Sequence, residues 1–397
     1  MTSSNRIKVL HTIGRLEFGG MQSGVLKVVN QVDRYLFRPS LVSLRGFDQN
    51  ARDRLATDVN FAVIARKQGR DWRLVLKLAA YFSKEKVQIV HSHNWETWLY
   101  TFLAARYAGV PVIIHGEHGL EADRLSDSKA RLAFKTMLAR QTDHLTTVSQ
   151  DIAARISKHW HIKKQKLSVM SNGVDLQKFF PSANRDDCKH RFGFEVEHFL
   201  IGTVVGRFTK VKDLPTLIRA FALVNRTHSH ARLVVVGGEN DSSKAALVTL
   251  TNELGINAYV HFIPLISQVE KAMQAFDLYV NSSIYEGMSN TILEAMACGA
   301  AIVATNVGGT PYIVQNRKTG LLVPAESPDK MSEAICSQIK DERLRHNLAR
   351  QAREMVQNNH SNEKFVQHHE ALYEKLYQKL VLKKTAASPL TASIPAN

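Results

Sequence analysis

Residues 277–309 read DLYVNSSIYEGMSNTILEAMACGAAIVATNVGG, and the fold prediction starts from this stretch. Two short apolar runs, at 277–283 and 300–306, flank a segment of helical length that follows a polar loop. Strands separated by a helix-length segment form a βαβ unit, in which the two strands lie parallel in one sheet. The stretch therefore predicts part of an α/β domain.

Apolar runs of strand length recur along the chain, with amphipathic segments such as WRLVLKLAAYFSKEK between them. The other runs lie at 7–13, 39–44, 87–93, 111–118, 143–149, 166–172, 199–205, 231–238, 259–263 and 319–325. Hydrophobic periodicity lapses in SNGVD (171–175) and PSANRDDCKHRFGF (181–194). We expect two doubly wound domains, residues 1–175 and 176–360, joined by this polar hinge.

The last part of the chain differs from both domains. Residues 361–380 carry an amphipathic helical pattern rich in aromatic residues, and we expect this helix to pack back toward the first domain. Residues 381–397 are predicted to be a disordered tail, because they hold too few large apolar side chains to form a core.

Composition favours a two-domain protein of a reducing compartment. The chain has 397 residues with 44% hydrophobic content, which suits two domains. Cys188, Cys298 and Cys336 are too scattered for a disulfide framework or a zinc site. MTSSNRIKVLHTIG has no secretory apolar core, and no run of about 18 apolar residues occurs, so we expect a cytoplasmic protein.

The charge is strongly positive and unevenly distributed. The net charge is +16, and residues 1–175 hold 27 Lys and Arg against 15 Asp and Glu. Nucleic acid, an anionic membrane and an anionic substrate would each suit such a balance. Nucleic acid is not expected as a partner, because no zinc finger, RNP-type aromatic pair or helix-turn-helix pattern accompanies the charge.

The first strand is followed by a glycine-rich loop. IKVLHTIGRLEFGGMQSGV places Gly14, Gly19 and Gly20 before a helix that is expected to begin near Met21 or Gln22. Such a loop lets backbone N–H groups and the helix N-terminus approach a phosphate. The spacing is not GxGxxG and no acidic ribose-binding residue follows IVHSH, which argues against a dehydrogenase. Phosphate contact and an ordinary turn stay open as alternatives.

Two cations follow the first strand of the second half. Arg207 leaves a buried strand at its carboxyl end, and Lys212 follows five residues later before an amphipathic helix. Ligands of open α/β sheets bind at that edge, where Arg and Lys would neutralise a diphosphate. An ordinary solvated loop is the alternative.

The stretch quoted first supplies two carboxylates to the same edge. Glu286 lies in the loop before a predicted helix and Glu294 about one turn inside it. A carboxylate offers only acceptors, which suits sugar and ribose hydroxyls. Ser289, Asn290 and Thr291 can cap the helix and present backbone N–H groups to an anion.

Together these segments resemble the retaining nucleotide-sugar glycosyltransferases of family 4, which have the GT-B architecture. The resemblance is carried by Gly19-Gly20, His118 in HGEHG, Arg207 with Lys212, and the Glu286-to-Glu294 element continuing as SNTILEAMACG. It extends to about residue 380. It implies two Rossmann-like domains facing each other across a cleft, an acceptor-side first domain and a nucleotide-sugar-binding second domain.

The resemblance also implies residue roles. Glu294 would hold the donor ribose and Glu286 would face the transferred sugar. The diphosphate would be bound by Arg207, Lys212, the backbone N–H groups of Ser289, Asn290 and Thr291, and the Gly19-Gly20 loop. His118 would lie beside the donor sugar, with His115 as the competing alignment. Met288 departs from the aromatic or other apolar residue that many relatives carry, which leaves the identity of the sugar open.

The implied reaction is transfer of a sugar from a UDP- or GDP-linked donor to a hydroxyl of a glycan or polyprenyl-linked glycan, as in bacterial exopolysaccharide loci. A GT-B sugar epimerase or a phosphorylase is the alternative. No cofactor is expected, and no metal, because no Asp-x-Asp motif precedes a diphosphate site. His91 and His93 are interpreted as structural or acceptor-side residues, since two alternating histidines are weak evidence for zinc.

A basic amphipathic segment follows His118. DRLSDSKARLAFKTMLARQ mixes apolar and basic residues and could place the protein peripherally on the inner face of an anionic membrane. These residues are Leu125, Leu132, Phe134, Met137, Leu138, Arg124, Lys129, Arg131, Lys135 and Arg140. A packed helix with a cationic outer face is the alternative interpretation.

Overall fold

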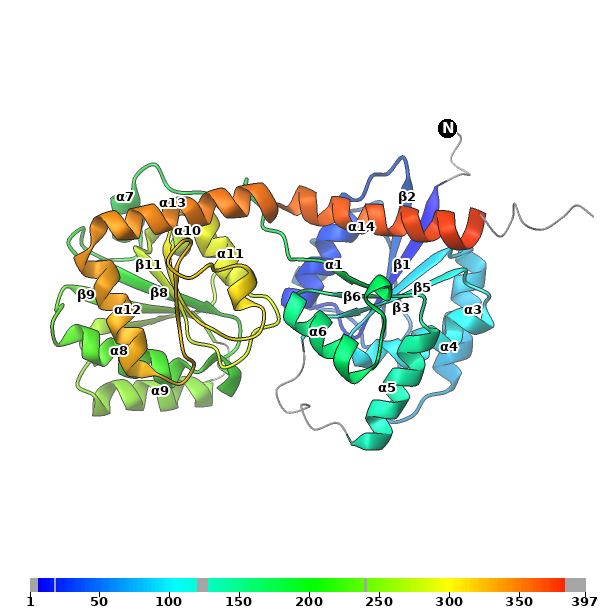
Figure 1. Ribbon diagram of the computed structural model, residues 1–397, viewed down its shortest axis with the longest axis horizontal. Coiled ribbons are helices and arrows are strands. Elements are labelled where there is room, and N and C mark those ends of the chain that lie inside the picture. The colour runs from blue at the N-terminus through cyan, green and yellow to red at the C-terminus, as the bar shows by residue number, and fades with distance from the viewer. Residues whose placement is uncertain (1–5, 18, 120–127, 239–240, 383–397) are drawn as a thin grey trace, which may run out of the picture.

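The computed structural model describes residues 6–17, 19–119, 128–238 and 241–382, and its strands form two parallel sheets. The first sheet has seven strands in the order β3-β2-β1-β4-β5-β6-β7, and the second has six in the order β10-β9-β8-β11-β12-β13. In both sheets the strand order reverses beside the first strand, so helices cover both faces (Figure 1). The prediction of two doubly wound α/β domains is confirmed.

Apart from β3, the described strands match the apolar runs of the sequence. They are β1 (Ile7–Ile13), β2 (Phe37–Ser43), β3 (Asn60–Val63), β4 (Ile89–His93), β5 (Val112–Glu117), β6 (His144–Thr147), β7 (Leu167–Val169), β8 (Phe199–Val205), β9 (Ala231–Gly237), β10 (Val260–Ile263), β11 (Leu278–Asn281), β12 (Ala301–Thr305) and β13 (Leu321–Val323). Central strands are buried on both faces, as all seven residues of β8 are, and therefore read as continuous apolar runs.

Helices connect the strands. They are α1 (Gly20–Gln31), α2 (Gln49–Arg52), α3 (Arg73–Glu85), α4 (Trp95–Tyr107), α5 (Lys129–Gln141), α6 (Gln150–His159), α7 (Arg185–Arg191), α8 (Leu214–Asn225), α9 (Asp241–Glu253), α10 (Val269–Ala275), α11 (Asn290–Ala297), α12 (Pro328–Lys340), α13 (Glu342–Asn359) and α14 (Asn362–Tyr377). Ser149, Ser289 and Ser361 cap α6, α11 and α14 through their hydroxyl oxygens. None of the described helices is long and apolar enough to cross a bilayer.

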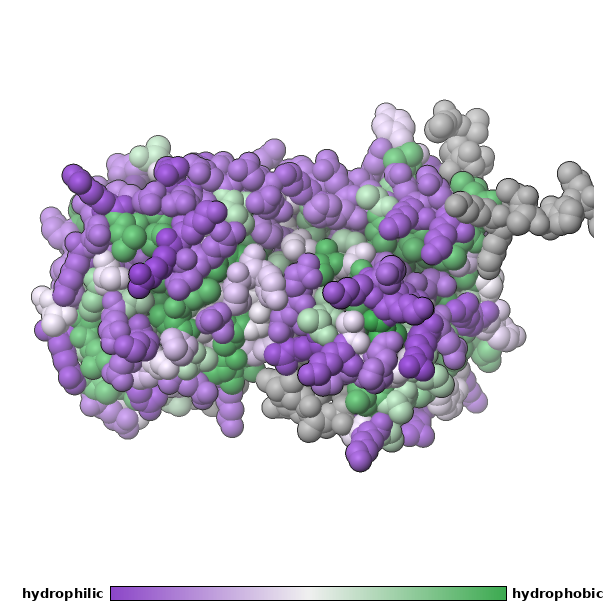
Figure 2. All heavy atoms as spheres, in the orientation of Figure 1, coloured by the Kyte–Doolittle hydropathy of each residue, from purple (hydrophilic) through white to green (hydrophobic). Residues whose placement is uncertain are grey.

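The chain passes between the two domains twice at one place. Val174 N donates to His360 O at 2.8 Å, and Asn362 N donates to Val174 O at 3.0 Å. After this crossing, α14 packs against α1 of the first domain, while α13 packs against α11 of the second (Figure 1). Figure 2 shows mainly hydrophilic side chains along the face that carries α13 and α14.

The structure differs from the sequence prediction in a few elements. Strand β3 was not predicted, because its residues lie at the sheet edge and are at most half-buried. Helix α1 begins at Gly20 rather than at Met21 or Gln22. Residues 381 and 382 belong to a short π-helical turn, Gln378–Leu382, whereas the rest of the predicted tail lies outside the described residues.

The end of β9 depends on a glycine. Gly237 has φ +121°, and a Cβ there would lie 1.7 Å from Val205 O of the neighbouring strand. We expect Gly237→Ala to lower the free energy of unfolding by about 3 kcal/mol or more, because backbone must shift. Gly255→Ala is the matched control: Gly255 has φ +67° with no atom within 4 Å, so only the left-handed penalty of about 1 kcal/mol applies. Urea unfolding followed by circular dichroism measures both, and equal losses would contradict the steric argument.

Candidate active site between the two domains

The N-termini of two helices meet where the domains face each other. Gly20 begins α1 of the first domain, and a Cβ on it would lie 3.3 Å from Asn290 Nδ2 at the start of α11. Ser289 Oγ accepts from Ile292 N at 3.4 Å and so caps α11. Both helix N-termini carry unpaired backbone N–H groups and a partial positive charge, which favour an anion between them.

Glu286 is the most heavily bonded acidic group of this region. Its Oε1 accepts from Lys212 Nζ at 2.6 Å, from Ser283 Oγ at 2.7 Å and from Asn281 Nδ2 at 3.3 Å. Among the described residues nothing bonds Oε2, although the residue is only 8% exposed. One carboxylate oxygen is thus fixed by the protein while the other is free to accept from a ligand hydroxyl.

The backbone of the Glu286 loop rests on a pair of glycines. Gly309 N donates to Glu286 O at 2.8 Å. A Cβ on Gly308 would lie 2.0 Å from Glu286 O, and one on Gly309 would lie 1.9 Å from Gly287 O. No role was predicted for these glycines, although the NVGG ending of residues 277–309 was a visible signal.

The first domain reaches this loop through the end of β5. A Cβ on Gly287 would lie 2.6 Å from His118 O, so the two segments touch across the domain boundary. His118 Nε2 lies 2.8 Å from His93 Nδ1. Burial lowers the pKa of His118 to about 3, so its imidazole is neutral near pH 7.

His115 lies elsewhere, although it is only three residues away in sequence. Its ring stacks on Trp98 of α4 at 3.9 Å between centroids, and its Nδ1 lies 2.9 Å from Ser92 Oγ. The side chain is 1% exposed. The structure therefore brings His118, and not His115, to the boundary between the domains.

The two predicted cations occupy different surroundings. Lys212 ends a short 3-10 turn, Lys210–Lys212, and bonds Glu286 directly. Arg207 has a side chain that is 70% exposed, and its Nη2 lies 3.5 Å from Glu17 Oε1 of the first domain. The Arg207 guanidinium thus already spans the boundary, at the carboxyl end of β8, with most of its donors facing solvent.

Glu294 faces the first domain from α11. Burial raises the pKa of this carboxyl group, and the positive charge of Lys27 on α1 opposes the shift. Lys27 Nζ donates to Gly173 O at the chain crossing. Thr291 Oγ1 on the same helix accepts from Tyr279 OH at 2.7 Å. Lys27 was not among the predicted site residues, because no local pattern pairs a residue of one domain with a carboxylate of the other.

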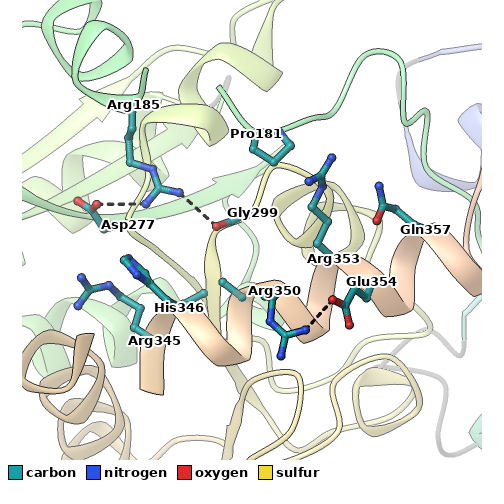
Figure 3. Close-up of a pocket in the computed structure, with 12 residues that line it drawn as sticks. Pro181, Arg185, Asp277, Gly299, Arg345, His346, Arg350, Arg353, Glu354 and Gln357 are labelled. Carbon is teal, nitrogen blue, oxygen red and sulfur yellow. Dashed lines mark hydrogen bonds and ion pairs between the residues drawn. The ribbon is translucent and has the colours of Figure 1, made fainter. Parts of the chain in front are cut away.

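A second hollow lies at the opposite end of the second sheet. This pocket of about 420 Å³ is lined by Arg185 of α7 and by Arg345, Arg350 and further residues of α13 (Figure 3). It includes Asp277, which precedes β11, and Ala301, which begins β12. The strands are parallel, so this pocket lies at their amino ends, whereas Lys212 and Glu286 follow the carboxyl ends of β8 and β11. It is separate from the candidate active site.

Two family profiles match the two domains. The profile described as Glycosyltransferase Family 4 matches residues 18–178, and that described as Glycosyl transferases group 1 matches residues 189–355. The candidate site combines residues from both ranges, since His118 lies in the first and Glu286 in the second.

Known proteins resemble the chain over most of its length. The Escherichia coli UDP-Gal:alpha-D-GlcNAc-diphosphoundecaprenol alpha-1,3-galactosyltransferase is 25% identical over 294 residues, covering 73% of this chain and 76% of that enzyme. A D-inositol 3-phosphate glycosyltransferase of Streptomyces scabiei is 31% identical over 257 residues, covering 60% of this chain and 57% of that enzyme, less than two thirds of its length.

Solved structures resemble the fold. The crystal structure of Anabaena HepE in complex with UDP and glucose superposes with a TM-score of 0.80 at 18% identity, covering 93% of this chain and 100% of that one. At this identity the likeness shows the fold alone. With the two profiles spanning both domains, the chain belongs to the group 1, family 4 glycosyltransferases and has the GT-B fold.

Proposed function

We propose that this glycosyltransferase moves a sugar from a UDP- or GDP-linked donor to a hydroxyl of a glycan or lipid-linked glycan, with retention of the anomeric configuration. The observation that carries the proposal is the Glu286 carboxylate, held by Lys212 through one oxygen and open at the other, beside the N-terminus of α11. Support for the donor and acceptor classes comes from the E. coli relative, whose name gives UDP-Gal and a diphosphoundecaprenol acceptor.

The proposed mechanism proceeds on one face of the donor sugar. The bond between the anomeric carbon and the diphosphate oxygen breaks, and a bond to the acceptor oxygen forms on the same face. The proton of the acceptor hydroxyl passes to the departing diphosphate oxygen. Lys212, Arg207 and the α11 N-terminus would stabilise the negative charge that develops there, which is the main contribution expected of the protein. We propose that these groups act without a divalent metal.

The acceptor side is proposed to lie against an anionic membrane through α5. Lys129, Ala133, Phe134, Met137 and Arg140 are exposed on this helix, with Phe134 37% and Met137 47% exposed. Lys135 and Leu138 are buried, and Lys135 Nζ lies over the rings of Trp95 and Trp160. The helix is therefore packed on one face and presents two apolar side chains between basic ones on the other, as a membrane-surface helix does. Arg124 and Leu125 lie outside the described residues.

Donor binding is the first test of this function. We expect one of UDP, GDP and ADP, or its sugar conjugate, to bind selectively in a thermal-shift and saturation-transfer NMR panel. Glu294→Gln should weaken that binding by roughly 10- to 100-fold, because the ribose hydroxyls lose a charged acceptor. Glu342→Gln on α13 is the control and should bind normally.

Metal independence is tested by repeating the binding panel, and an assay of sugar transfer, in excess EDTA. Both binding and turnover should persist. Turnover lost in EDTA and restored by Mg²⁺ or Mn²⁺ would contradict the metal-free mechanism.

The products of the reaction separate the alternative enzymes. Transfer of sugar to inorganic phosphate rather than to an alcohol would identify a phosphorylase, and inversion of a sugar centre in the donor would identify an epimerase.

Lys212 should be required for turnover. We expect Lys212→Ala to lower kcat by about 100-fold or more, since it removes a cation from the leaving diphosphate and leaves Glu286 without its ion pair. Lys210→Ala is the matched control, because Lys210 is exposed in the same turn and should leave kcat unchanged. Thermal unfolding of both variants separates a loss of folding from a loss of catalysis. Near-normal turnover of a folded Lys212→Ala variant would count against the assignment.

Membrane binding is tested by co-sedimentation with vesicles of phosphatidylcholine with and without phosphatidylglycerol. We expect binding that needs the anionic lipid, falls as salt is raised and is weakened in a Phe134→Ser/Met137→Ser variant. Tyr35→Ser changes a residue that is 88% exposed on another element and is the control. Equal sedimentation with and without phosphatidylglycerol would remove the membrane proposal.

A further inference from the structure

Three histidines of the first domain form a hydrogen-bonded row that starts at the candidate site. His118 Nε2 lies 2.8 Å from His93 Nδ1, and His93 Nε2 lies 2.9 Å from His11 Nδ1. His11 and His93 stack with an interplanar angle of 6°. His11 is in β1, His93 ends β4 and His118 follows β5, so the row runs across the sheet from strand to strand.

The row continues to the C-terminal helix. His11 Nε2 lies 3.3 Å from the Tyr373 hydroxyl of α14, and the same hydroxyl lies 2.9 Å from His91 Nδ1. His91 Nε2 lies 3.1 Å from Thr146 Oγ1 in β6. These six side chains, His118, His93, His11, Tyr373, His91 and Thr146, are called the histidine chain below.

The imidazoles of the histidine chain are neutral. Burial lowers the pKa of His11 to about 3 and the pKa values of His91 and His93 well below the ordinary value. A neutral imidazole has one N–H donor and one bare nitrogen acceptor. Each ring with two partners must therefore donate to one neighbour and accept from the other. The buried Tyr373 hydroxyl has a single hydrogen, which must go to one of its two ring partners. Two arrangements meet both conditions over the five hydrogen bonds.

The two arrangements differ in the direction of donation. In one, His118 Nε2–H donates to His93 and each group donates onward until His91 Nε2–H donates to Thr146. In the other, Thr146 donates to His91 and every proton points the opposite way, so His118 carries its proton on Nδ1. Fixing one member fixes all the others, because a reversed ring would leave a buried nitrogen unsatisfied.

The distances at Tyr373 favour the first arrangement. Hydroxyl donors make shorter hydrogen bonds than N–H donors. The shorter contact of the Tyr373 hydroxyl, 2.9 Å, is to His91 Nδ1, and the longer, 3.3 Å, is to His11 Nε2. In this arrangement Tyr373 donates to His91 and accepts from His11.

We propose that Tyr373 is a positioning residue that, through His11 and His93, fixes His118 in the tautomer with Nε2 protonated and Nδ1 bare. Resting on the proposed function, this inference gives His118 Nδ1 the role of accepting a hydrogen bond from a hydroxyl of the donor sugar or the acceptor. The hydrogen bond to His93 uses His118 Nε2, and among the described residues nothing bonds His118 Nδ1. Helix α14 thereby determines which ring nitrogen of His118 donates and which accepts.

The backbone leaves room for the histidine chain at one glycine. A Cβ on Gly116 would lie 3.0 Å from His93 Nδ1, 3.1 Å from His118 Nε2 and 3.1 Å from Thr146 Oγ1. The added methyl group of Gly116→Ala would therefore disturb both the hydrogen bond between His118 and His93 and the position of the Thr146 hydroxyl.

Metal binding explains the same histidines less well. The ring nitrogens of His11, His91 and His93 lie within 4.8 Å of one another. Tetrahedral zinc with Zn–N bonds of about 2.0 Å requires ligand nitrogens roughly 3.3 Å apart. Both nitrogens of each of these rings already have a partner, so a metal ion would have to break the hydrogen bonds that the structure contains.

The test is ¹⁵N NMR of the full chain with labelled histidine and no ligand, with the His118 signals assigned by their loss in His118→Asn. We expect the shift pattern of protonated Nε2 and bare Nδ1. Tyr373→Phe should move these signals toward the average of the two tautomers and lower kcat about tenfold or more at nearly unchanged KM. Tyr377→Phe is the matched control, because the Tyr377 hydroxyl also joins α14 to the sheet, accepting from Gln88 Nε2 at 3.0 Å, but lies outside the histidine chain.

Two results would overturn the inference: protonated Nδ1 in the wild type, or His118 signals that respond equally to Tyr373→Phe and Tyr377→Phe. If Tyr373→Phe fails to fold, Gly116→Ala is measured instead, and unchanged His118 signals there would also overturn it. The tautomer is read without substrate, so a failure of the proposed glycosyl transfer would leave this measurement intact.

Discussion

The position of one domain against the other depends on two places where the chain crosses between them. These two crossings can lie in direct contact only because residue 173 is a glycine. A Cβ on Gly173 would lie 2.7 Å from Ser361 O and 2.8 Å from Phe365 Cβ, so the first crossing can lie directly beneath the second. Val174 then bonds the backbone on both sides of Ser361. Because the two crossings are hydrogen-bonded to each other, the carboxyl ends of both sheets are held toward one boundary. The Glu286 loop, the α1 N-terminus and His118 all meet there.

The charges at that boundary are compensated within the protein. Lys212 neutralises Glu286, Glu17 lies beside Arg207, and Lys27 opposes the burial of Glu294. A buried carboxylate without such partners would be costly and would take up a proton. The pairing compensates these charges before a ligand arrives, and Oε2 of Glu286 has no bond among the described residues, so it is available to a ligand hydroxyl.

Sequence reasoning located the strands well because parallel strands buried on both faces read as apolar runs. Strand β3 was not predicted, because its two end residues are exposed and its two middle residues are only half-buried at the sheet edge. The ends of the predicted strands were enough to place Glu286 and Lys212 at one sheet edge. In the structure Lys212 Nζ donates to Glu286 Oε1 at 2.6 Å. The glycine pair Gly308-Gly309 was visible in the sequence, but its contact with the Glu286 loop could not be derived, because that contact depends on a close approach between the backbones of two loops.

The histidine chain shows most clearly what local sequence patterns cannot predict. His11 lies on β1 and His91 and His93 lie on β4, and each alone looks like a polar residue in a core. Their pairing follows from the strand order β1-β4-β5-β6, and the last partner, Tyr373, is 362 residues from His11. Burying four imidazoles is tolerable only if each nitrogen between them is satisfied. Helix α14, which follows the second crossing, supplies Tyr373 as a partner for two of these rings. Its packing on the first domain is therefore needed to satisfy the buried histidines beneath the site as well as to hold the two domains together.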